Sequence, residues 1–291
     1  MASSSAPTYR EHPLRVACVQ YDPKLRDVQG NLNKASEMTD PLKPGQVDLV
    51  VFPEMAFTGY MFTSPESIEP FLEEPRIGPT ALFCRSLAKR IGAYVIAGYP
   101  ERSSVPGTNG WNSATVFSPS GDIVHNYRKS FLFDTDKFWA QEGDGFSFVD
   151  LPQPIGRLCL AICMDINPKD FLSPWDAYEL SRYAQKHSVD TLVLTANWLD
   201  PPAPTDPPPT GSELEDKEEE DEKDSPDGPS FSTLNYWAHR LMPLHDPPPP
   251  PPGIFLEETS ERDEREVLQK EVVFVCCNRV GLEEGTTFVD L

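Results

Sequence analysis

The sequence predicts a layered α/β fold with buried sheets. Seven short runs rich in Val, Ile or Phe are bounded by Gly, Pro, Asp or Asn, as strands usually are. Segments with a 3.6-residue apolar period lie between several of these runs, and the turn-forming segment 118–122 joins two strands as a hairpin. Strands that alternate with helices pack as sheets covered by helical layers. With 291 residues, 38% of them hydrophobic, the chain can form one large domain of this type or two small ones.

The predicted elements are spread along most of the chain. The seven strands cover Leu14–Gln20, Val47–Phe52, Ala93–Gly98, Ser113–Phe117, Leu158–Ile162, Thr191–Thr195 and Val272–Cys276. Helices are predicted over Pro79–Ile91 and Trp175–Lys186, because Ala and Leu recur on one face of each segment.

One segment, Pro201 to Pro252, breaks the alternation of strands and helices. It holds fifteen of the 32 prolines, and residues 213–227 within it carry ten acidic side chains against two lysines. Such a composition buries too little apolar surface to offset the entropy lost on ordering, so a largely disordered insertion is predicted. Within it, Phe231 to Leu244 has the apolar spacing of a short helix that docks on the domain. The proline tracts are candidate sites for Pro-rich-motif binders such as SH3 or WW modules, with a solvated loop as the simpler interpretation.

The net charge of −21 argues against two classes of partner. Nucleic acids and anionic membranes both attract basic surfaces, so neither is expected to bind this chain. No run approaches the roughly 18 apolar residues of a membrane span. Residues 1–13 are predicted to be a flexible N-terminus, and the small polar start lacks the features of a signal peptide.

The cysteines and histidines show no metal-ligand or disulfide pattern. None of the six cysteines has CxxC spacing and most lie in apolar runs, which favours reduced thiols and a cytoplasmic, or also nuclear, location. Cys18 and Cys159 are predicted to be small buried hydrophobic residues. The five histidines show no ligand spacing, so no metal is predicted.

Three residues of complementary chemistry lie near strand ends: Glu54 in VVFPEMAFTGY, Lys129 in HNYRKSFLF and Cys163 in GRLCLAICMDINP. A carboxylate at the end of an apolar strand points toward the crevice in which α/β proteins bind ligands, and partial burial suits it as a general base. A lysine can stabilise a thiolate and an oxyanion. A cysteine at a strand end can be exposed beside backbone N–H groups. Taken singly, these residues are more simply a solvated loop acid, a surface lysine and a buried thiol.

Together the three side chains meet the needs of amide hydrolysis through a thioester. Glu54 can take the proton of the Cys163 thiol and later protonate the leaving ammonia. Lys129 can stabilise the oxyanion, aided by the backbone N–H of Met164. No histidine, metal or organic cofactor is required, so no cofactor is predicted.

The ordered blocks FPEMAFTGY, NYRKSFLF and LAICMDINP resemble the nitrilase superfamily of carbon–nitrogen hydrolases. The resemblance implies a four-layer α–β–β–α sandwich over residues 14–291, interrupted by the insertion at 201–252. It also implies a Glu–Lys–Cys triad, which falls on Glu54, Lys129 and Cys163, and it suggests a homodimer.

Three further blocks narrow the resemblance to one branch: CMDINPKDFLSPWDAYELSRYA, LVLTANWLDPP and STLNYWAHRLMPL. They are similar to the fungal protein N-terminal asparagine/glutamine amidohydrolases. This branch implies deamidation of N-terminal Asn and Gln to Asp and Glu with release of ammonia, as a step of the N-degron pathway. Many superfamily members carry an arginine soon after the cysteine, whereas INP follows Asp165 here, which also favours this branch.

A substrate with a free α-amino group is cationic, so an acidic residue is expected to attract it. The acidic candidates that flank the motif blocks are Asp134, Asp136, Glu142 and Asp165, and the block with Trp198 adds an aromatic candidate. Many family members also have a second glutamate between the lysine and the cysteine. Glu142 is the nearest candidate for this position and Asp136 is its rival.

Two other functions stay open from the sequence. One is a nitrilase-type amidase that acts on free small amides, such as glutamine or ω-amide acids. The other is a non-catalytic scaffold, because the family pattern continues after TTF with a further glycine- and serine-containing strand. The resemblance therefore implies a C-terminally shortened chain with an exposed sheet edge, which would lower its stability.

Overall fold

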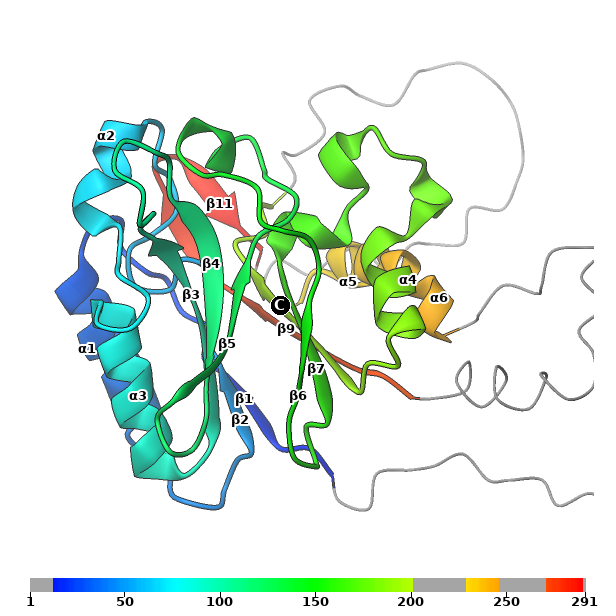
Figure 1. Cartoon of the computed structure of the whole chain (residues 1–291), viewed down its shortest axis with the longest axis horizontal. Coiled ribbons are helices and arrows are strands. Elements are labelled where there is room, and N and C mark those ends of the chain that lie inside the picture. The colour runs from blue at the N-terminus through cyan, green and yellow to red at the C-terminus, as the bar shows by residue number, and fades with distance from the viewer. Residues whose placement is uncertain (1–12, 201–228, 246–270, 290–291) are drawn as a thin grey trace, which may run out of the picture.

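The structure, a computed structural model, describes residues 13–200, 229–245 and 271–289 (Figure 1). Within these residues two mixed β-sheets pack face to face, and helices cover the outer face of each sheet. The predicted four-layer α–β–β–α sandwich is therefore confirmed. Residues 1–12 and most of the predicted insertion at 201–252 lie outside the described residues.

The first sheet has the strand order β1-β2-β3-β4-β5. Its strands are β1 (Val16–Cys18), β2 (Leu49–Val51), β3 (Tyr94–Glu101), β4 (Trp111–Phe117) and β5 (Ile123–Arg128). β1, β2 and β3 run parallel, whereas β4 pairs antiparallel with both β3 and β5. The predicted turn at 118–122 joins β4 to β5, so the hairpin is confirmed.

The second sheet has the strand order β6-β7-β8-β9. Its strands are β6 (Phe148–Asp150), β7 (Arg157–Ile162), β8 (Thr191–Ala196) and β9 (Val273–Asn278). β7, β8 and β9 run parallel and β6 is antiparallel to β7. A separate two-stranded ribbon is formed by β10 (Gly281–Glu283) and β11 (Thr286–Phe288).

The strand β2 is apolar on both faces because both of its faces are covered. In β2, Leu49 and Val51 pack between the two sheets, whereas Val50 packs under the outer helices. This two-residue alternation, with apolar side chains at every position, is typical of buried parallel sheets.

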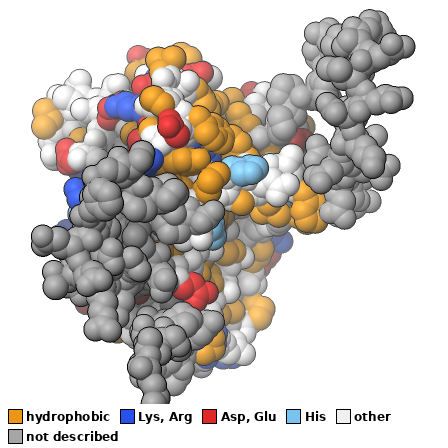
Figure 2. All heavy atoms as spheres, turned by 90° about the vertical axis from the view of Figure 1, so that its right-hand side faces the viewer, with side chains coloured by type: hydrophobic (Ala, Val, Ile, Leu, Met, Phe, Trp, Pro, Cys, Tyr) orange, Lys and Arg blue, Asp and Glu red, His pale blue; other side chains and the backbone are white. Residues whose placement is uncertain are grey.

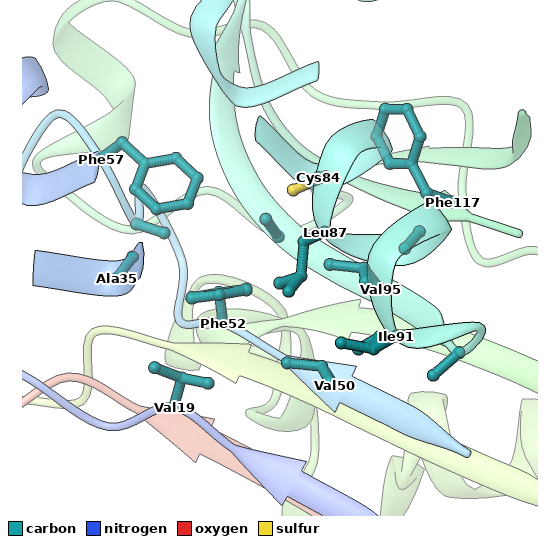
Figure 3. Close-up of a cluster of buried hydrophobic side chains, with 14 of the residues drawn as sticks. Val19, Ala35, Val50, Phe52, Phe57, Cys84, Leu87, Ile91, Val95 and Phe117 are labelled. Atoms are coloured by element: carbon teal, nitrogen blue, oxygen red, sulfur yellow. The ribbon is translucent and has the colours of Figure 1, made fainter. Parts of the chain in front are cut away.

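Two helices cover the first sheet: α1 (Val28–Thr39) and α3 (Pro79–Ile91). Figure 3 shows Leu87 and Ile91 of α3 directed toward Val50 and Val95 of the sheet. α3 has the predicted bounds. It begins with Pro at its first position and ends before Gly92, whose φ of 66° is the left-handed conformation that glycine adopts without strain.

Three helices cover the second sheet: α4 (Glu179–Lys186), α5 (Phe231–Arg240) and α6 (Met242–His245). Leu180, Ala184 and Trp237 pack there against the outer faces of β7 and β8. The helix predicted over Phe231–Leu244 is thus present as α5 and α6. Figure 2 shows this side of the molecule, where hydrophobic side chains are interspersed with polar ones.

The single helix predicted over Trp175–Lys186 is wrong over its first four residues. The structure has a 3₁₀ turn over Trp175–Ala177, and Tyr178 then takes a left-handed conformation with φ 46° before α4 begins. The buried side chain of Arg240 explains the break. Its guanidinium donates to the Trp175 carbonyl and lies 5.2 Å from the Tyr178 ring centre, which holds this turn out of the helix.

The remaining short elements lie in the connections. They are α2 (Pro65–Ile68) and the 3₁₀ turns η1 (Glu69–Phe71), η2 (Asp136–Phe138), η3 (Cys163–Ile166), η4 (Lys169–Phe171) and η5 (Trp175–Ala177). Among the helices of the described residues, none is both long and apolar enough to cross a membrane.

All six cysteines are described, and each is a free thiol. Cys159 is buried as predicted. Cys18 is exposed, contrary to the prediction, because β1 is the edge strand of its sheet.

We expect Leu87→Ala to lower the free energy of unfolding by about 2–5 kcal/mol, because it opens a cavity between α3 and the first sheet. Leu82 on the same helix is 55% exposed, against 4% for Leu87, so Leu82→Ala serves as the control and should change stability by less than about 0.5 kcal/mol. Urea unfolding of both variants measures the difference. Equal losses would contradict the assignment of the buried face of α3.

Candidate active site

Four polar residues follow strands whose ends meet where the two sheets face each other. Glu54 comes after β2, Lys129 after β5, Cys163 after β7 and Asn197 after β8. The carboxyl ends of parallel strands lie at one edge of a sheet, and this is where α/β proteins place their sites. The structure therefore brings together the three residues predicted to form a catalytic group.

The centre of the site is an ion-pair cluster around Lys129. Its Nζ lies 2.8 Å from Glu54 Oε1 and 2.6 Å from Asp136 Oδ2, and all three side chains are fully buried. Asn112 Nδ2 bridges the two carboxylates, donating to Glu54 Oε1 at 2.7 Å and to Asp136 Oδ1 at 2.9 Å. A buried ammonium is tolerated where carboxylates replace its lost hydration, as they do here.

The turn that carries Glu54 is pressed against β3. A Cβ atom at Gly98 would lie 2.6 Å from Glu54 Cα and 2.7 Å from Met55 N, so this strand position requires glycine. The Asn197 N–H donates to Glu54 Oε2 at 2.8 Å from the second sheet. Both carboxylate oxygens of Glu54 are thus held by donors, which fixes the orientation of the group.

Burial and neighbouring charges set the protonation of the cluster. Burial raises the pKa of Glu54, while the Lys129 charge opposes this rise and the Asp136 charge adds to it. Burial raises the pKa of the Cys163 thiol, and the Glu54 carboxylate raises it further against the opposing Lys129 charge. Burial alone lowers the pKa of Lys129, but Asp136 and Glu54 outweigh it, so the pKa is raised. At neutral pH the resting site therefore holds a protonated lysine and a protonated thiol.

Cys163 directly follows β7 and is the first residue of the 3₁₀ turn η3. Its φ of 41° lies in the left-handed region that residues other than glycine rarely occupy. The first turn of a helix leaves N–H groups without partners in the helix, and Met164, predicted to stabilise an oxyanion, lies there. A strand-to-helix turn of this kind presents a nucleophile beside backbone donors.

Asp165 stabilises the turn that carries Cys163. Its buried carboxylate accepts four hydrogen bonds of 2.8–3.1 Å, from the N–H groups of Ile162, Ser130 and Phe131 and the hydroxyl of Tyr127. Burial raises the pKa of Asp165 to about 6, although these hydrogen bonds oppose the rise. Both oxygens of this substrate-binding candidate are thus occupied by protein donors, and Asp165 is not among the residues that line the cavity beside Cys163.

The carboxylate beside Lys129 is Asp136, not Glu142. The Glu142 side chain is half exposed and pairs with Lys169 at 3.0 Å. Asp136 begins the 3₁₀ turn η2, which folds it inward, and its Oδ2 also accepts from the N–H of Phe133 at 2.9 Å. Asp134, another acidic residue that the sequence offered for binding the α-amino group, is also exposed and pairs with Lys137.

A cavity of about 240 Å³ opens beside Cys163. It is lined by Phe133, Cys163, Met164, Asn167, Phe171, Asn197, Trp198, Leu199 and Tyr236. Trp198, an aromatic candidate from the sequence, is among the lining residues. The nucleophile candidate therefore lies in the wall of a mostly apolar pocket, with the buried charges of Glu54 and Lys129 behind it.

Several lining and supporting residues were not predicted. Asn112 lies inside a buried strand, and Asn197 directly follows one, so an amide at an apolar position was the available signal. Tyr236, which donates to Asn167 Oδ1, comes from α5, a helix that the sequence predicted without a role in the site.

Comparisons with known proteins agree with this geometry. Residues 15–172 match the carbon–nitrogen hydrolase family. The chain is 34% identical to the protein N-terminal amidase of Schizosaccharomyces pombe over 79% of this chain and 80% of that protein. It is 27% identical to the protein N-terminal amidase of Saccharomyces cerevisiae over 66% of this chain and 46% of that protein.

The fold agrees as well. A crystal structure of an N-terminal amidase with an Asn-Glu-Ala peptide superimposes with a TM-score of 0.73 at 21% identity, covering 95% of this chain and 88% of that chain. With the family match extending over more than half of the sequence, the chain belongs to the carbon–nitrogen hydrolase family, within the branch of the protein N-terminal amidases.

Proposed function

We propose that this hydrolase deamidates N-terminal Asn and Gln of proteins or peptides to Asp and Glu, with release of ammonia. The observation that carries the proposal is the buried cluster of Glu54, Lys129 and Asp136 behind Cys163, at the wall of the cavity. Relatives named protein N-terminal amidase, and a structural neighbour that holds an Asn-Glu-Ala peptide, support this substrate class.

In the first half of the proposed reaction Glu54 takes the proton of the Cys163 thiol as sulfur bonds to the carboxamide carbon. The carbonyl electron pair moves to oxygen, and Lys129 and the Met164 N–H stabilise the oxyanion. Glu54 then passes the proton to the amide nitrogen. The C–N bond breaks, ammonia leaves, and a thioester on Cys163 remains.

In the second half a water molecule attacks the thioester carbon and Glu54 takes one of its protons. The C–S bond breaks, the proton returns to sulfur, and the carboxylic acid product leaves. One water is consumed and one ammonia is released in each cycle. Lys129 keeps its proton throughout, because the pKa of its ammonium is raised by the two carboxylates.

The size of the cavity is consistent with a chain end as substrate. At about 240 Å³ it is smaller than the roughly 300–1,000 Å³ of pockets for drug-sized ligands. Such a space suits one terminal residue better than an internal segment of a polypeptide.

We expect ammonia release from short peptides that begin with Asn or Gln, and a loss of about 10⁴-fold or more in the Cys163→Ala variant. Each peptide is assayed beside its N-acetylated twin, which carries the same carboxamide without the cationic amine. Release from the free peptides alone supports an N-terminal amidase.

The same assay separates the competing functions. Equal release from the acetylated twins would move the assignment to a general amidase for small amides. No release from protein shown by circular dichroism to be folded would favour a non-catalytic role.

Asp136→Asn should lower kcat by about 10²-fold, because Lys129 loses one of its two charged partners and the field behind Cys163 changes. Glu142→Gln is the matched control, since its ion pair is exposed, and it should stay within about twofold of the parent. Steady-state ammonia assays of both variants measure this. A larger effect of Glu142→Gln would restore Glu142 as the second carboxylate.

The acid limb of kcat/KM should lie above the ordinary glutamate pKa of about 4.3. Burial raises the pKa of Glu54, so the base is protonated, and activity lost, at a higher pH than for an exposed glutamate. A pH–rate profile measures the limb, and circular dichroism at each pH excludes unfolding as its cause. An acid limb at or below the ordinary value would contradict Glu54 as the buried base.

A further inference from the structure

Asn197 carries a buried amide that the fold does not use. Its side chain is 3% exposed and lines the cavity beside Cys163. Among the residues that the structure describes, neither its Oδ1 nor its Nδ2 has a hydrogen-bond partner. Folded proteins leave few buried polar atoms unpaired, because such atoms have lost their hydration without compensation. A buried amide without hydrogen-bond partners at the wall of a cavity indicates a group that binds a ligand.

The backbone around Asn197 is fixed independently of this side chain. Its own N–H donates to Glu54 Oε2, the Ala196 carbonyl accepts from Arg279 N at 3.1 Å, and Trp198 N donates to Asn278 Oδ1 at 2.7 Å. The backbone that carries the amide is therefore held in position beside the reacting centre before any ligand arrives, which reduces the entropy lost on binding.

The lining of the cavity contains no charged side chain within the described residues. The nearby carboxylates of Glu54 and Asp136 are paired with Lys129, and Asp165 is held by its four donors. Asn167, the other lining amide, already accepts from Tyr236. A cationic group that enters this cavity therefore meets amide dipoles and aromatic rings. Among the described lining residues, Asn197 Oδ1 is a buried side-chain acceptor without a partner.

We propose that Asn197 is the specificity-determining residue that binds the α-amino group of the substrate. Its Oδ1 accepts a hydrogen bond from the α-ammonium, and its Nδ2 donates to the first peptide carbonyl. The face of Trp198 adds a cation–π contribution. The inference rests on the proposed function and deepens it, since it gives the physical basis on which a free N-terminus would be distinguished from a blocked one.

A neutral acceptor suits this position better than a carboxylate. A third negative charge beside Glu54 and Asp136 would compete for Lys129 and raise the pKa of Glu54 further. An amide supplies the acceptor for the ammonium without disturbing the charge balance on which the chemistry depends.

The test uses Asn197→Leu, which is nearly isosteric and removes both polar atoms. In a Cys163→Ala background, calorimetry measures the binding of an Asn-Gly-Ala peptide and of its desamino analogue, in which a succinamoyl group replaces Asn. We expect the parent to bind the free-amine peptide at least about tenfold more tightly than the analogue. In the Asn197→Leu protein this ratio should fall to about one, mostly through weaker binding of the free-amine peptide.

Thr195→Val is the matched control. Thr195 Oγ1 is also buried and unpartnered within the described residues, but this residue lies inside β8 and does not line the cavity. Both substitutions should raise the melting temperature, because each removes an unpaired buried polar group, while Thr195→Val leaves the binding ratio unchanged. Asn197→Ala repeats the test if Asn197→Leu does not fold.

An unchanged ratio in the folded Asn197 variants, or a parent without preference for the free amine, would overturn the inference. Ammonia release by the unmodified protein is measured separately. Its absence refutes the proposed function, whereas release combined with an unchanged ratio refutes only the role of Asn197.

Discussion

The site depends on one interaction, the burial of the Lys129 ammonium between Glu54 and Asp136. A buried charge is strongly destabilising unless it is paired and hydrogen-bonded in the folded structure. Glu54 lies in the connection from β2 to β3, Asp136 lies in the connection from β5 to β6, and Asn112 of β4 bridges the two carboxylates. The cluster therefore forms only when β2, β4 and β5 have assembled in their native order, which couples the chemistry directly to the fold.

Apolar packing of the strands fixes the positions of the strand ends, and these ends carry residues of the site. Residues of β2, β7 and β8 are buried on both faces, so a shift in register would expose apolar side chains or bury polar ones. The strand ends are fixed in turn, and they carry Glu54, Cys163 and Asn197. Gly98 lies so close to the turn that carries Glu54 that any side chain at this position would displace the base.

Much of this arrangement could be predicted from the sequence, because strand ends are marked by a change from apolar to polar residues. That change identifies Glu54 and Cys163, and the order of the motif blocks adds Lys129. The choice between Asp136 and Glu142 could not be made, since both are loop acids after Lys129 and only the inward turn η2 separates them. Helix α1 was missed because its sequence is mostly polar, and it buries only Asn31, Ala35 and Thr39. Asn197 was missed because an unpaired amide is a property of the folded environment.

The pKa of the Cys163 thiol and that of the Glu54 carboxyl are both raised, and the two shifts have a common cause in burial. A thiolate formed in advance would be open to oxidation. Here burial raises the pKa of the thiol and also that of the carboxylate that must accept its proton. Because both values move in the same direction, the donor and the acceptor remain closer in proton affinity than if the thiol alone were buried. Lys129 holds its proton more tightly than an exposed lysine, so it contributes a fixed charge rather than a proton. The proposed reaction therefore forms the nucleophile only as it attacks, and it can use Glu54 for every proton transfer.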